Sequence, residues 1–96
     1  MDLNALAALP GADLVMAGLR DTRAGVDSPE ARLIQIGAIN LRARGLDVPR
    51  ATGTGSPEHE LYDLLERTYG KAAHSRYNAL IRRLVSFERA LACASR

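Results

Sequence analysis

SPEARLIQIGAINLRARG, residues 28–45, is the stretch with the strongest helical signals in the sequence. Ser28 is a good N-cap because its hydroxyl accepts hydrogen bonds from free backbone amides, and Pro29 loses nothing at the first helical position. Glu30 follows at the positive end of the helix dipole. We therefore predict a helix that begins at Ser28 and ends near Gly45.

The apolar residues of this helix are spread around most of its circumference rather than along one stripe. They are Leu33, Ile34, Ile36, Ala38, Ile39, Leu41 and Ala43. A helix with this pattern is normally buried, so we place it at the centre of the fold. Gly37 then marks a position where a neighbouring backbone comes close. A β-strand over LIQIGAINL is the alternative, but its alternation is poor and its ends carry helical signals.

Two helices are predicted before this segment. The first, LNALAAL after Asp2, ends at Pro10-Gly11, and the second covers residues 13–25 with Gly25 as a left-handed end.

A connector over about residues 45–56, containing Pro49 and two glycines, follows the central helix. Ser56-Pro57-Glu58 repeats the earlier start and opens a helix to Tyr69, which Gly70 ends or kinks. The last helix runs from about Ala72 to the C-terminus. Strand signals are nearly absent. We predict an all-α fold, a small bundle of four to five helices in a single α-helical domain, 1–96.

The composition favours self-association. Hydrophobic residues make up 47% of the 96 residues, but much of that share is alanine, with one Phe, no Trp and three Tyr. A small chain with little apolar volume per helix has a small margin of stability, and joining a second copy buries more surface. We expect a homo-oligomer, most simply a dimer.

The sequence carries no signal for secretion or for a membrane. Its N-terminus lacks the positive region of a signal peptide, and no apolar run approaches the length of a membrane span. The single cysteine, Cys93, excludes an intrachain disulfide. We expect a soluble, cytoplasmic protein without membrane contact.

The positive charge is concentrated in the last helix. The net charge is +2, but from Lys71 to Arg96 there are six bases and one acid. Four arginines border an apolar arc of roughly 160° on this helix: Arg76, Arg82, Arg83 and Arg89. They are possible partner or nucleic-acid contacts, gripping phosphates in the second case. We favour the simpler interpretation that their stems flank a buried stripe.

Glu88 is the exception within that arc, because it falls among the apolar residues Tyr77, Leu80, Ile81, Leu84, Phe87 and Leu91. A carboxylate alone in an apolar seam is unfavourable by several kcal/mol or takes up a proton. We predict a buried ion pair of Glu88 with an arginine of another helix, Arg32, Arg42 or Arg44, or of a second copy of the chain.

The remaining motifs give weak chemical signals. TGTGSPEHE has a Gly-x-Gly before a helix, but no strand precedes it and two glutamates would repel a phosphate. Glu58-His59-Glu60 places potential metal ligands side by side, yet adjacent helical residues point about 100° apart. We predict no catalytic, cofactor-binding or metal-binding residues. An enzyme or small-ligand binder with a site between helices around His74, Tyr77 and Glu88 ranks lowest.

The sequence thus favours a small non-catalytic helical interaction module that self-associates and binds another protein. The alternative is a nucleic-acid-binding helical domain that uses the basic C-terminal helix.

Overall fold

The computed structural model describes residues 6–50 and 55–94. The helices are α2 (Ala12–Arg23), α3 (Pro29–Ile36), α4 (Ala38–Ala43), α5 (Pro57–Tyr69), the 3-10 helix η1 (Gly70–Ala72) and α6 (Ala73–Ala94). Throughout these two ranges the regular structure is helical, without strands. The predicted small all-α bundle is confirmed. Residues 2–5 of the predicted first helix and 51–54 of the connector lie outside the described residues.

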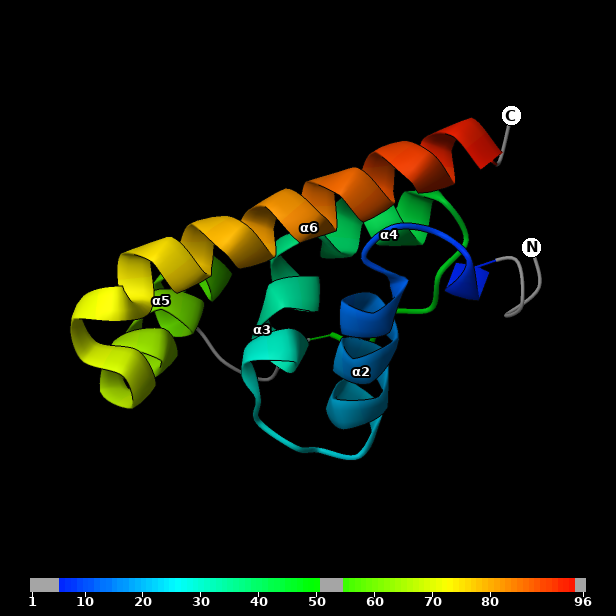
Figure 1. The fold of residues 1–96 in the computed structure, drawn as a ribbon. Coiled ribbons are helices and arrows are strands. Elements are labelled where there is room, and N and C mark those ends of the chain that lie inside the picture. Colours follow the sequence, from blue (N-terminus) through cyan, green and yellow to red (C-terminus); the bar gives the residue numbers. More distant parts are fainter. Residues whose placement is uncertain (1–5, 51–54, 95–96) are drawn as a thin grey trace.

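The long helix α6 lies across the others, with α2 and α3 side by side beneath it and α5 under its N-terminal part (Figure 1). The core fills the space between these helices. Its largest fully buried side chains are Phe87, Leu33, Ile34, Leu41, Leu61, Leu65, Leu91 and Val15. None of the helices in the described ranges is both long and apolar enough to cross a bilayer.

The start of α3 is as predicted. Ser28 is extended, with φ −144°, and its Oγ accepts a hydrogen bond from the amide of Ala31 at 3.1 Å. Pro29 occupies the first helical position. The segment is also central, since α3 contacts α2, α5 and α6.

The prediction of one continuous helix to Gly45 is wrong, because α3 stops at Ile36 and the short α4 resumes after Gly37. A Cβ at Gly37 would lie 2.7 Å from Oε1 of Glu88 and 3.2 Å from the methyl groups of Leu84. The close neighbours of Gly37 are therefore side chains of α6, and not a backbone as predicted.

Backbones approach closely at two other glycines. Gly11, the N-cap of α2, has φ +79°, and a Cβ there would lie 2.5 Å from the carbonyl oxygen of Arg83 on α6. Gly18 lies equally close to the main chain of α3 at Glu30. Both positions need glycine because a side chain would separate the helices that meet there.

The link between α5 and α6 is a turn rather than a kink. Gly70 has φ +58° and begins the 3-10 helix, after which α6 packs back on α5. At the other end of α5 the helix starts at Pro57 as predicted. The second cap does not repeat the first, since Ser56 Oγ donates to the Glu58 carboxylate at 2.8 Å and caps no amide.

The buried stripe of α6 is confirmed. Leu84, Phe87 and Leu91 are at most 3% exposed, and Leu80 is partly buried against the same core. The last helix therefore turns its apolar side inward.

Candidate interaction surface

An open groove of about 490 Å³ lies between α4 and the C-terminal half of α6. Its lining residues are Asn40, Leu41, Ala43, Arg44, Glu88, Arg89, Leu91 and Ala92. Leu41 and Leu91 form its buried floor, whereas the polar residues and the two alanines line its sides. We call the groove together with Ile39 the α4–α6 surface.

Ile39 is the most exposed large hydrophobic residue of the described ranges, with 82% of its surface accessible. It lies on α4 one helical turn from the exposed Ala43, so the two form a small apolar face beside the groove. The sequence placed Ile39 in a helix buried on most sides. The break at Gly37 makes α4 a separate element at the edge of the bundle, and this leaves Ile39 uncovered.

Two other large hydrophobic residues in the described part of the chain are exposed, but one is covered by an arginine and the other lies in a loop away from the groove. Tyr69 is 41% exposed, but the guanidinium of Arg76 covers its ring at 4.4 Å from the centroid. Val26 is 50% exposed in the loop between α2 and α3. Neither borders the groove.

Glu88 is half-buried, and its partner within the chain is an amide. Its Oε2 accepts a hydrogen bond from Nδ2 of Asn40 at 3.2 Å, and Oε1 lies against Gly37. Among the described residues it makes no ion pair with an arginine. The three arginines proposed for this role do otherwise: Arg32 binds Asp27 and Glu60, Arg42 donates to the Val48 carbonyl, and Arg44 lies exposed in the groove. Pairing with an arginine of a second copy stays a prediction.

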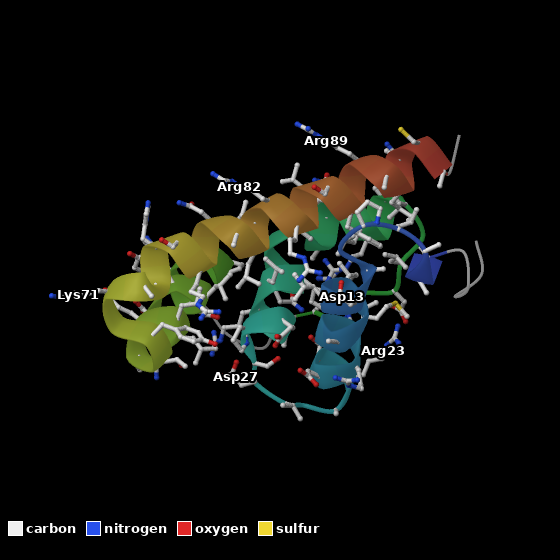
Figure 2. All side chains as sticks on the ribbon, viewed as in Figure 1. Asp13, Arg23, Asp27, Lys71, Arg82 and Arg89 are labelled. Carbon is white, nitrogen blue, oxygen red and sulfur yellow. The ribbon has the colours of Figure 1, made fainter. Side chains whose placement is uncertain are left out.

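The four arginines of α6 are not brought together in one patch. Arg83 donates to Oδ1 of Asp13 on α2 at 2.5 Å, and this hydrogen bond lowers the pKa of the Asp13 carboxyl. Arg76 lies on the Tyr69 ring. Arg82 and Arg89 point away from the body of the molecule and have no acidic partner among the described residues (Figure 2).

The charges of the groove are of both signs. Glu88 and Arg89 come from α6, and Arg44 is the C-cap residue of α4. Arg44 extends no side-chain hydrogen bond or ion pair to any residue in the described ranges. The α6 wall of the groove therefore carries an acid and a base, Glu88 and Arg89, and the other wall carries Arg44, with apolar side chains between the walls.

The proposed ligand site around His74, Tyr77 and Glu88 does not assemble. His74 and Glu88 are 14 residues apart on the same straight helix, about 21 Å along its axis. The His74 ring contacts Asn78, and Tyr77 packs against Tyr62 with centroids 5.7 Å apart. Within the described ranges no three His, Cys, Asp or Glu side chains come together as metal ligands.

Sequence reasoning missed the role of Asn40 and the exposure of Ile39. The available signal was Gly37, a poor helix former in the middle of an otherwise strong helix. A break there separates residues 38–43 from the buried helix and gives them a surface of their own.

Comparison of the chain with protein-family models, curated proteins and solved structures finds no match.

Proposed function

We propose that this chain is a small non-catalytic helical interaction module that self-associates through the α4–α6 surface. The observation that carries the proposal is the 82% exposure of Ile39 beside an open groove with an apolar floor. Full burial of an isoleucine side chain is favourable by about 1.5–3 kcal/mol relative to exposure. Association with a partner that covers Ile39 is favoured by this free energy, because the side chain stays exposed in the isolated chain.

The shape of the surface supports a protein partner rather than a small molecule. The groove is only partly enclosed and has polar side chains on its walls, whereas pockets for small ligands enclose most of the bound molecule. Apolar side chains surrounded by polar and charged ones are typical of protein interfaces, in which arginine is also enriched. We also propose that the chain binds a different protein as a further partner. We propose a cytoplasmic location, which is consistent with the single cysteine of the sequence.

Sedimentation velocity over a hundredfold dilution series tests this function. We expect the wild-type chain to shift from monomer to dimer as its concentration rises. Ile39→Asp should weaken the dimer at least tenfold, because it places a charge where an apolar contact forms.

Val26→Asp is the matched control, because it makes the same change at an exposed apolar residue outside the surface. It should leave the dissociation constant unchanged. A wild-type chain that stays monomeric at the highest concentration contradicts the proposal, and so does an equal effect of the two substitutions.

Nucleic-acid binding is the second candidate, favoured by one observation, the outward direction of Arg82 and Arg89 (Figure 2). It is the weaker of the two because Arg76 and Arg83 are already engaged within the chain.

A further inference from the structure

We infer that two copies of the chain meet about a two-fold axis between Glu88 and Arg44, so that each Glu88 pairs with Arg44 of the other copy. This inference rests on the proposed self-association and names the contact that fixes its geometry. It also supplies an arginine for Glu88, which pairs with none among the described residues of its own chain.

Symmetry constrains how two identical chains meet. Dimers of identical chains are most often two-fold symmetric, so the same surface is used by both copies and residue i faces j while j faces i. Glu88 lies on the α6 wall of the groove and Arg44 on the α4 wall. A rotation of 180° about an axis between them exchanges the two positions. Each acid then faces a base, and the surface is complementary to itself.

Both side chains are available for this contact. Glu88 accepts only one hydrogen bond in the described chain, from Asn40 at 3.2 Å, and a carboxylate has room for several more. Arg44 is exposed and its guanidinium has no partner within the described ranges. A guanidinium fits a carboxylate with two parallel hydrogen bonds, and such a contact fixes orientation as well as adding attraction.

Apolar contacts surround this charge pair. Ile39 and Ala43 lie on the exposed side of α4, and Ala92 lies one turn beyond Glu88 on α6. An axis that passes between α4 and α6 brings these residues under the second copy. An axis between Glu88 and Arg89 would instead centre on α6 alone, and Arg89 points away from the body (Figure 2). Arg44 is therefore the partner that also covers Ile39.

Mixing of two charge-reversed chains tests the pairing directly. Glu88→Arg places two arginines opposite each other in its homodimer, and Arg44→Glu places two glutamates opposite each other. We expect each variant alone to dimerise at least tenfold more weakly than the wild-type chain in sedimentation velocity. An equimolar mixture should form a heterodimer within about threefold of wild-type affinity, because both contacts are then of opposite charge.

Arg82→Glu is the matched control, since it reverses an exposed arginine of α6 that does not line the groove. Its mixture with Glu88→Arg should not restore dimers. Rescue of Glu88→Arg by Arg89→Glu instead of Arg44→Glu overturns the proposed axis.

The neutral variant Glu88→Gln covers the case in which Glu88→Arg fails to fold, which circular dichroism detects. We expect the wild-type dimer to weaken as salt rises from 50 to 500 mM, and the Glu88→Gln dimer to be weaker at low salt and less sensitive. The pairing is overturned if Ile39→Asp disrupts the wild-type dimer but Glu88→Gln does not weaken it and the mixture of Glu88→Arg and Arg44→Glu does not restore it. Self-association through the α4–α6 surface would still hold in that case. A wild-type monomer overturns both.

Discussion

Gly18 on α2 lies directly against the main-chain carbonyl of Glu30 on α3. A Cβ at residue 18 would clash with that oxygen and would also lie 2.6 Å from Cγ2 of Ile34. The helices α2 and α3 pack on each other more extensively than any other pair of described elements. Their close crossing at Gly18 therefore sets how α2 is held in the fold.

The sign of the change in the free energy of unfolding caused by Gly18→Ala tests this crossing. Helix propensity alone predicts that alanine stabilises α2 by about 1 kcal/mol. We expect instead a loss of about 2–3 kcal/mol in the free energy of unfolding, because the obstructing atom is backbone and cannot move aside alone. Urea unfolding followed by circular dichroism measures the difference. A stabilised variant would show that the two helices separate at no cost.

Gly45→Ala is the control for this substitution. Gly45 has φ +93° and no atom within 4 Å of an added Cβ, so alanine there meets backbone strain without a clash. We expect a loss of about 1–2 kcal/mol, the usual cost of a left-handed residue with a side chain.

The sequence was sufficient for those features of the fold that depend on neighbouring residues. The all-α class, the Ser28 cap, the left-handed Gly25 and the buried stripe of α6 all follow from local pattern and are present in the structure. Local pattern also has a limit. The same tripeptide caps α3 at Ser28 but not α5 at Ser56, whose φ is −68° and whose hydroxyl bonds to Glu58.

The candidate surface depended on contacts between distant residues and was not predictable. Asn40 and Glu88 are separated by 48 positions, and Arg83 and Asp13 by 70. Which polar group Glu88 meets is decided by the break at Gly37 and by the way α4 then lies on α6. Periodicity describes one helix at a time, so it cannot give this pairing.

Arg32 is expected to contribute more to stability than the other arginines in ion pairs. Its guanidinium binds both oxygens of Asp27, at 2.8 and 2.7 Å, and also Glu60 on α5. Arg32→Lys keeps the charge but loses this planar fork, so we expect a loss of about 1–2 kcal/mol in the free energy of unfolding.

Arg20→Lys is the matched substitution, because the Arg20 side chain is 75% exposed and pairs with Asp21 only at 3.7 Å. Its effect should stay below about 0.5 kcal/mol. Urea unfolding of both variants gives the comparison, and equal losses would contradict a special role for Arg32.

Stability is expected to fall in acid. The hydrogen bond from Arg32 lowers the pKa of Asp27 from its ordinary value of 3.8, and Arg83 does the same for Asp13. With a lowered folded-state pKa, the unfolded chain takes up protons first as the pH drops. The stabilisation is therefore complete well above pH 4 and is lost as the pH falls through the folded-state pKa.

Thermal unfolding at pH 6 and pH 3 measures this effect. Asp27→Asn should reduce the difference in Tm between the two pH values, because it removes one of the titrating carboxyls. Asp63→Asn is the control, since the Asp63 carboxylate makes no ion pair or side-chain hydrogen bond within the described residues. An unchanged pH difference in Asp27→Asn would count against the assigned cause.

Nucleic-acid binding, the alternative function, predicts a limited salt dependence. Of the four arginines of α6, only Arg82 and Arg89 point outward without a partner among the described residues (Figure 2). Two neutralised phosphates give a slope of about −2 in a plot of log affinity against log salt concentration. We therefore expect labelled duplex and single-stranded oligonucleotides to bind weakly at 50 mM salt and not measurably at 200 mM.

The double variant Arg82→Gln/Arg89→Gln should abolish the residual binding, whereas Arg83→Gln should not, since Arg83 is engaged with Asp13. A slope of −4 or steeper that Arg76→Gln and Arg83→Gln both reduce would mean that all four arginines reach phosphates, and would make the nucleic-acid interface the better assignment.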